Sequence, residues 1–250
     1  MFKKIGIFCL AVLMLFCFMT SCQTVEKEDG YTYRLNKDKK GYTLTDVEKC
    51  GTEVTIDKFH GLPITAIGKK VFFGTKFEKI RTVVIGDSVV EIGEGAFYYC
   101  PNLSSVKFGN SVQIIGDSAF YDCDALSSVT LPDSVLRIEA NAFGVCDDNL
   151  KTVHLGKNVT YIGEFAFDYC SALVSINLPQ SVKTIDNGAF AYCKGLTYVF
   201  FEGTPADFEK INVGEGNNAL INHLYYYSYT QPTSVGNYWH YDAEGKPVAW

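Results

Sequence analysis

The chain has 250 residues, of which 47% are hydrophobic and 14% aromatic, and it carries 22 Lys and Arg against 28 Asp and Glu. These proportions exclude a disordered, a collagen-like and a multi-span membrane protein. The net charge is −6 and no basic run lies beyond the first few residues, so nucleic acid is not an expected partner.

The first 21 residues are typical of an export signal. Two lysines precede an apolar run over residues 5–19, which is shorter than the roughly 20 apolar residues of a membrane-spanning helix. The segment Met19-Thr20-Ser21-Cys22 resembles a bacterial lipobox, in which the cysteine becomes the lipid-modified first residue of the mature chain. We therefore expect a lipoprotein signal peptide over residues 1–21 and a lipid anchor on Cys22 that holds the chain on a membrane, outside the cytoplasm. An ordinary signal peptide cut near the same place is the alternative.

The next residues are expected to connect this anchor to a folded unit. Residues 22–30 are mostly polar and are predicted to form a short tether. Residues 31–61 are predicted to form an N-terminal cap.

A 23-residue repeat dominates the middle of the chain. Five phenylalanines are spaced 23, 23, 24 and 23 residues apart; each is preceded by Ala and followed three positions later by Cys. Leucine and valine columns run in phase with them. The four columns are Phe97, Phe120, Phe143, Phe167 and Phe190; Cys100, Cys123, Cys146, Cys170 and Cys193; Leu103, Leu126, Leu150, Leu173 and Leu196; and Val89, Val112, Val135, Val159 and Val182.

Each unit opens with alternating apolar residues, which predict a strand, and continues with a second extended V-x-x-I segment. Its A-F-x-x-C end is expected to form a short helical or 3₁₀ turn. A unit of this length cannot bury its apolar face alone and must stack on its neighbours. The predicted fold is an α/β leucine-rich-repeat solenoid of about six 23-residue rungs over residues 62–203, with an irregular rung near Phe72 and a C-terminal cap over residues 204–250.

The units over residues 88–203 follow the pattern S-V-x-x-I-G-x-x-A-F-x-x-C-x-x-L, in full over residues 88–103 and 111–126 and with departures in the other three. With this pattern they resemble the BspA-like leucine-rich repeats of bacterial surface proteins. The resemblance implies a cell-surface interaction protein, either an adhesin or a module that binds host matrix or another surface protein.

Catalytic, metal and cofactor sites are not expected. A repeat lays identical side chains in parallel columns, whereas catalysis needs different side chains that converge on one point. The four histidines have no zinc-ligand spacing, and no calcium-binding loop motif is present. The column cysteines are expected to be reduced, buried side chains rather than disulfides or metal ligands.

A binding surface is expected on the outward-facing strand positions. Most of these are small and polar, but the C-terminal rungs carry His154, Asn177, Tyr198 and Phe200, which are larger side chains of the kind enriched at interfaces. A bland solvated sheet, with Phe200 covered by the C-terminal cap, is the alternative interpretation.

A second candidate lies in the C-terminal cap. The segment around Trp239 and Tyr241 faintly resembles a hairpin of choline- or glucan-binding repeats, in which aromatic faces stack on a ligand. Such modules work in tandem and this chain has one copy, so a capping role is favoured. A cell-wall or glycan-binding lipoprotein is therefore the alternative function.

Overall fold

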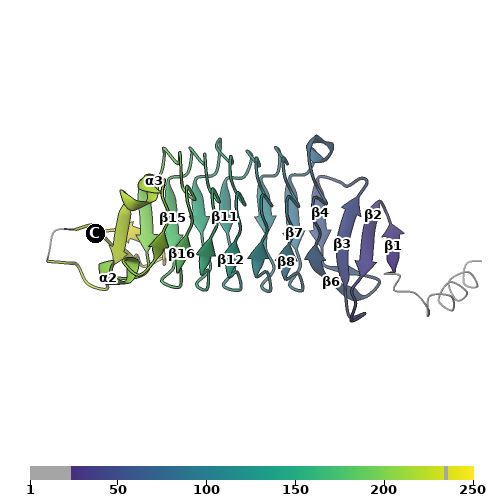
Figure 1. The fold of residues 1–250 in the computed structure, drawn as a ribbon, viewed down its shortest axis with the longest axis horizontal. Coiled ribbons are helices and arrows are strands. Elements are labelled where there is room, and N and C mark those ends of the chain that lie inside the picture. Colours follow the sequence, from purple (N-terminus) through teal and green to yellow (C-terminus); the bar gives the residue numbers. More distant parts are fainter. Residues whose placement is uncertain (1–23, 234–235) are drawn as a thin grey trace, which may run out of the picture.

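The computed structural model describes residues 24–233 and 236–250. These residues form an elongated stack of about eight turns, with the strands running across its long axis (Figure 1). The predicted signal peptide over residues 1–21 and the predicted lipid site at Cys22 lie outside the described residues.

One side of the stack is an 11-stranded sheet. It is antiparallel at its N-terminal end and parallel along the path from β3 to β18, as expected for strands that recur once in every rung, and β5 adds an antiparallel pair with β6. Its strands are β1 (Val25–Glu28), β2 (Tyr31–Leu35), β3 (Tyr42–Val47), β6 (Leu62–Ile67), β8 (Glu91–Ile92), β10 (Ile114–Ile115), β12 (Arg137–Ile138), β14 (Tyr161–Ile162), β16 (Thr184–Ile185) and β18 (Asn212–Val213), with β5 (Lys58–Phe59) paired with β6.

The other side carries the strands predicted from alternating apolar residues, and it consists of two sheets. The N-terminal sheet has three strands, β4 (Glu53–Ile56), β7 (Thr82–Ile85) and β9 (Ser105–Lys107). The second sheet has seven strands, β11 (Ser128–Thr130), β13 (Thr152–His154), β15 (Ser175–Leu178), β17 (Tyr198–Phe201), β19 (Leu224–Tyr227), β20 (Tyr238–Tyr241) and β21 (Pro247–Ala249).

The core is a set of columns that run along the stack. The phenylalanine rings of successive rungs lie nearly parallel, with centroids 4.9–5.4 Å apart from Phe72 to Phe190. Phe72 of the irregular rung thus extends this column by one ring. All six of these rings are fully buried, so one continuous apolar core extends through the rungs.

The column cysteines are free thiols inside the core, as predicted. Each Sγ donates to the carbonyl oxygen of the phenylalanine in the preceding rung; in the central rung Cys146 reaches the Phe120 oxygen at 3.2 Å. Burial raises the pKa of Cys146 to about 12. These thiols thus act as small core side chains that also link adjacent rungs.

The A-F-x-x-C segments differ from the prediction, because they are turns without helix. No helix forms because the residue directly before each column cysteine has a positive φ, which a right-handed helix does not allow. These residues are Tyr99, Asp122, Val145, Tyr169 and Tyr192. That conformation costs a non-glycine residue roughly 1–2 kcal/mol. Backbone bonds between rungs offset this cost, for example from Val145 N to the Asp168 oxygen at 2.7 Å.

Helix is therefore scarce in the described residues and the fold is a β-solenoid. The helical elements are η1 (Thr75–Phe77), α2 (Pro205–Phe208) and α3 (Asn218–Ile221). The 3₁₀ turn η1 belongs to the rung that was predicted to be irregular, and it buries Phe77 in the core.

The predicted boundaries of the solenoid also differ from those observed. Residues 25–28, expected in the tether, form β1, because they pair along their length with β2. Strand β4 lies within the predicted N-terminal cap but pairs in parallel with β7, and β18 and β19 of the predicted C-terminal cap pair with β16 and β17. The rung pattern thus continues beyond residues 62–203 at both ends.

We predict that Phe143→Ala lowers the free energy of unfolding by about 3–5 kcal/mol, because it leaves a cavity between two stacked rings. Urea denaturation followed by circular dichroism measures this loss. Thr130→Ala, at an exposed position of β11, is the control, and its free energy of unfolding should lie within about 0.5 kcal/mol of the wild-type value. Equal urea midpoints for the two variants would show that the phenylalanine column is not the core.

Candidate functional site

The outward-facing side chains of β7 to β17 form two aligned columns, which we call the strand ridge. The observed pairing sets Thr130 beside His154, and Asn177 beside Phe200. The full columns are Thr82, Ser105, Ser128, Thr152, Ser175 and Tyr198, and Val84, Lys107, Thr130, His154, Asn177 and Phe200.

The strand ridge is divided between its second and third strands. Among the described strands, β9 pairs with β7 and β11 pairs with β13, but β9 and β11 belong to different sheets. Val106 in the centre of β9 is also half-buried, whereas the equivalent Val129 and Val153 are buried. The C-terminal half of the ridge, from β11 onwards, is therefore a separate and continuously paired surface.

Two of the predicted binding residues are accessible on this C-terminal half. The His154 side chain lies at the exposed end of β13. Tyr198 is 36% exposed, and its ring lies 5.7 Å from that of Phe200 and 5.5 Å from that of Tyr225 on the next strand. Tyr225 extends the same surface by one strand, which sequence reasoning missed because β19 was assigned to the cap rather than to a further rung.

Asn177 is half-buried and its amide group is used inside the structure. Its Oδ1 accepts from Leu155 N at 2.7 Å, and its Nδ2 donates to the Leu155 oxygen at 3.2 Å and to Glu202 at 3.4 Å. The Asn177 amide thus bonds both the N–H and the carbonyl oxygen of Leu155 in the previous rung, as a backbone peptide group would. This position holds the surface in shape rather than presenting free hydrogen-bonding groups.

Phe200 does not lie on the accessible surface. It is 6% exposed, and Tyr225 and Trp239 cover its ring, with centroids 6.0 Å and 5.4 Å away. The prediction that Phe200 contacts a partner is therefore wrong. The side chain lies under the C-terminal segment, as the alternative interpretation had it. The reason is that β19 and β20 continue the sheet past β17 and bring aromatic residues over it.

The predicted glycan platform is likewise not available as expected. Trp239 is fully buried, and its Nε1 donates to the Phe201 oxygen at 2.8 Å. A ring with no exposed face cannot stack on a sugar. Trp239 packs against Phe200, Tyr227 and Tyr241, so it covers the last strands of the sheet instead of facing a ligand.

Tyr241 is the accessible member of that pair. Its hydroxyl donates to Glu202 at 3.0 Å, and partial burial, together with the Glu202 charge, raises the pKa of Tyr241 to about 12. Glu202 also accepts from Asn177, so this one carboxylate connects the C-terminal cap to the strand ridge. Sequence reasoning did not single out Glu202, since no motif distinguishes it from other surface carboxylates.

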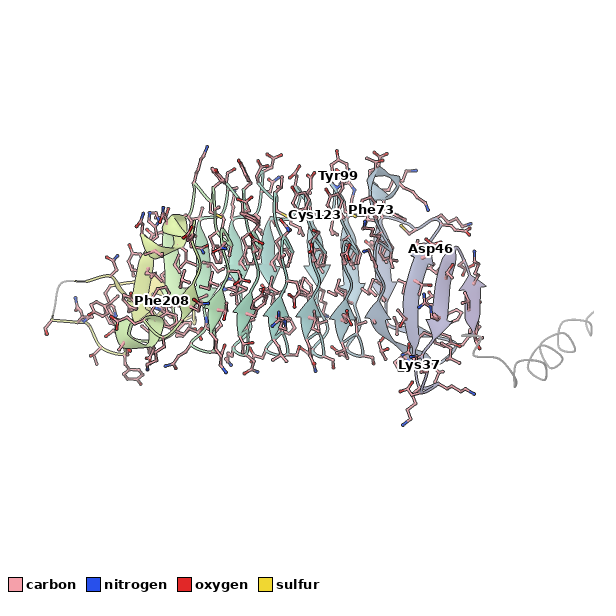
Figure 2. The ribbon with its side chains drawn as sticks, viewed as in Figure 1. Lys37, Asp46, Phe73, Tyr99, Cys123 and Phe208 are labelled. Carbon is pink, nitrogen blue, oxygen red and sulfur yellow. The ribbon has the colours of Figure 1, made fainter. Side chains whose placement is uncertain are left out.

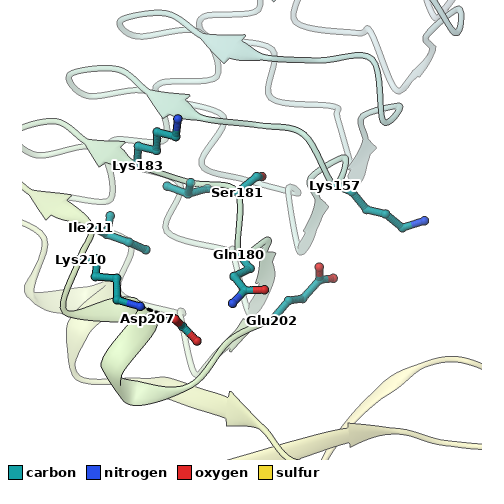
Figure 3. A pocket seen from close by; sticks show the side chains of 9 residues that line it. Lys157, Gln180, Ser181, Lys183, Glu202, Asp207, Lys210 and Ile211 are labelled. Carbon is teal, nitrogen blue, oxygen red and sulfur yellow. Dashed lines mark hydrogen bonds and ion pairs between the residues drawn. The ribbon is translucent and has the colours of Figure 1, made fainter.

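A cleft of about 600 Å³ lies beside the ridge, between the turns that follow β13 and β15 and the helix α2 (Figure 3). Its charged residues are Lys157, Lys183, Glu202, Asp207 and Lys210. Lys210 bonds to Asp207 at 2.8 Å; this bond and hydrogen bonds from Thr204 hold the pKa of Asp207 well below its usual range. The charges of the cleft are thus mixed, and two of them neutralise each other.

Within residues 24–233 and 236–250, three acidic side chains come close enough to share a metal ion. The carboxylate oxygens of Asp124, Asp147 and Asp148 lie within 4.8 Å of one another. These residues lie on the turns around the cysteine column and not on the strand ridge. The same described residues include no helix that is long and apolar enough to cross a membrane.

Comparison with known families identifies the repeat. The model of the BspA-type leucine-rich repeat region matches residues 65–197 in six copies. No curated protein matches the chain.

Three solved structures have a similar fold. A leucine-rich repeat protein of T. pallidum aligns with a TM-score of 0.68 and 27% identity over 76% of this chain and 86% of its own. A leucine-rich cell surface protein of Faecalibacterium prausnitzii aligns with a TM-score of 0.67 and 27% identity over 90% of this chain and 60% of its own. A leucine-rich repeat protein of Bacteroides ovatus aligns with a TM-score of 0.62 and 28% identity, over 81% of this chain and 54% of its own. The chain thus matches little more than half of the length of the latter two proteins.

Proposed function

Because this chain belongs to the family of BspA-type leucine-rich repeat proteins, we propose that it acts at the cell surface as a module that binds another protein. The binding face in this proposal is the C-terminal half of the strand ridge. The partner is a host-matrix protein or another surface protein. The F. prausnitzii relative, described as a leucine-rich cell surface protein, supports the proposed location.

The observation that carries this proposal is the aromatic surface on neighbouring paired strands. Tyr198 and Tyr225 lie side by side, and His154 projects two strands away on the same sheet. Aromatic side chains lose little conformational entropy on binding and supply large contact areas, so they are frequent hot spots at interfaces. The sheet beneath them is fixed by parallel pairing, which leaves little reorganisation to oppose binding.

The test is a binding screen followed by matched variants. The full chain in detergent is assayed against immobilised matrix proteins and purified glycans. For a protein that is captured, His154→Ala with Tyr198→Ala should weaken binding by at least about 2 kcal/mol, the usual effect of losing interface anchors. Asn177 is left intact because its amide holds the backbone.

The control replaces two side chains by alanine on the N-terminal half of the strand ridge. Thr82→Ala with Ser105→Ala should bind the captured protein as wild type does, since these side chains belong to the separate N-terminal sheet. Retention by glycans alone, or unchanged affinity in the His154 and Tyr198 variant with an unchanged circular dichroism spectrum, would reject the strand ridge as the binding face.

We further propose that Cys22 carries the lipid that anchors the protein to the membrane. The motivation is the lipobox-like segment at the end of the apolar run. Cys22→Ala should abolish acylation, so that metabolic labelling with a fatty acid is lost and the protein leaves the detergent phase or stays uncleaved. Equal labelling and equal detergent partitioning of the variant and wild type would exclude this cysteine.

A further inference from the structure

The A-F-x-x-C turns form one long edge of the solenoid, which we call the turn edge. Tyr99 and Phe73 lie on this edge, and Cys123 lies just inside it (Figure 2). Of the residues with positive φ described above, Tyr99, Tyr169 and Tyr192 are exposed here. A glycine would fit that backbone without cost, so the large side chains at Tyr169 and Tyr192 are not explained by the turn itself.

Two aromatic stacks lie on the turn edge. In the first, Phe73, Tyr98 and Tyr121 are stacked with centroids 4.8 and 5.0 Å apart. In the second, Tyr169 and Tyr192 are stacked at 4.4 Å, and Tyr192 is 57% exposed. Phe73 and Tyr169 are also exposed, whereas Tyr98 and Tyr121 are half-buried. Both stacks lie on a surface separate from the strand ridge.

The surface between the two stacks is acidic. The spacing of the repeat is longer by one residue in this rung, because Cys146 and Leu150 enclose three residues where the other copies have two. The added residue places Asp147 and Asp148 next to Asp124 of the preceding rung. Two further aspartates, Asp122 and Asp168, belong to the neighbouring positions of the same turns.

This acidic surface has no cationic partner within the described part of the chain. The ion pairs of residues 24–233 and 236–250 involve none of these five aspartates. Buried oxygens of Asp124 and Asp168 accept no hydrogen bond there. Burial and the neighbouring carboxylates raise the pKa of Asp124 to about 6. A ligand that donates N–H groups would stabilise the charged carboxylates.

The chemistry of the whole surface selects a basic peptide segment. The tyrosines within each stack cover one face of each neighbour, so a ligand meets their ring edges and the outer faces of the end rings. Lysine and arginine side chains combine a cationic head for the carboxylates with an apolar stem that packs along aromatic surface.

We propose that the turn edge, from Tyr98 and Tyr121 to Tyr169 and Tyr192, binds a lysine- and arginine-rich segment of a protein partner. The five aspartates between the stacks hold its cationic groups, and the tyrosines pack against its apolar stems. This surface is independent of the strand ridge, so the chain has two faces for partners of different chemistry.

The test uses a synthetic lysine- and arginine-rich peptide as the probe and a glutamate-rich peptide of equal length as its counterpart. Fluorescence anisotropy with the full chain should show saturable binding of the basic peptide alone. Asp124→Asn, Asp147→Asn and Asp148→Asn together should weaken this binding by about tenfold or more, since charge-assisted hydrogen bonds are lost. The isosteric amides keep the shape of the turns.

Two further variants separate the proposal from net charge and from misfolding. Asp38→Asn, Asp46→Asn and Asp117→Asn make the same change of charge at exposed positions elsewhere, and should alter the affinity by less than about twofold. Tyr169→Gly with Tyr192→Gly suits the positive φ, which offsets the loss of the stacked pair, so the variant should keep the circular dichroism spectrum of wild type and still weaken peptide binding by about threefold or more.

Three results would overturn the proposal. The first is an equal loss of affinity in the two sets of aspartate variants, which would show a general charge effect. The second is unchanged binding by the double glycine variant. The third is saturable calcium binding that displaces the peptide and is lost in the Asp124, Asp147 and Asp148 variant, which would make the turns a metal site. The His154 and Tyr198 variant should keep full peptide binding, so failure of this proposal is distinguishable from failure of the strand ridge.

Discussion

Every rung of this solenoid depends on the rungs beside it, because the side chains that fill its interior find much of their packing in the neighbouring turns. The phenylalanine rings stack on one another at 4.9–5.4 Å, and the cysteine thiols donate to carbonyl oxygens one rung away. Strand pairing on both sides follows the same spacing. Stability is therefore a property of adjacent pairs of rungs rather than of a single rung.

This dependence also determines where binding surfaces can arise. Inward positions are constrained to repeat, since each must match the position above and below it. Outward positions are free to vary, and there the chain departs from its own repeat. Tyr198 follows a column of Ser and Thr side chains, His154 lies in the more varied second column, and the extra residue after Cys146 brings three aspartates together. The departures from periodicity are thus the features that give this protein its individual surfaces.

The periodic part of the structure could be predicted from the sequence. The phenylalanine, cysteine, leucine and valine columns established the stacking, the irregular rung around Phe72 and the alignment of the strand ridge, since a shared period fixes all of these together. The conformation of the turns was not predictable in the same way. An A-F-x-x-C segment fits a helical turn by composition, and only the bonds between rungs select the positive φ at positions such as Val145.

The ends of the solenoid and the site were less predictable for a related reason. Phe200 occupies an outward position by the repeat, but aromatic residues of the aperiodic C-terminal segment cover it, and no pattern indicates that Trp239 returns to the Phe201 carbonyl. Asn177 is also predicted to bind a partner because it occupies an outward position, but its amide group bonds the backbone of Leu155. A repeat predicts contacts between equivalent positions, whereas these contacts join positions that are not equivalent.

That the rungs are stable only together can be measured through the thiol that each repeat carries. Alkylation of the native protein, followed by mass spectrometry at increasing urea concentrations, gives the opening free energy at each cysteine of the column. Mutual stabilisation of the rungs predicts very slow labelling of Cys123, Cys146 and Cys170 without denaturant, because buried thiols with raised pKa values are inert, and labelling of all three in one cooperative transition. Rapid labelling of one central cysteine while its neighbours stay protected would contradict it, since a single rung would then open without disturbing the rungs on either side.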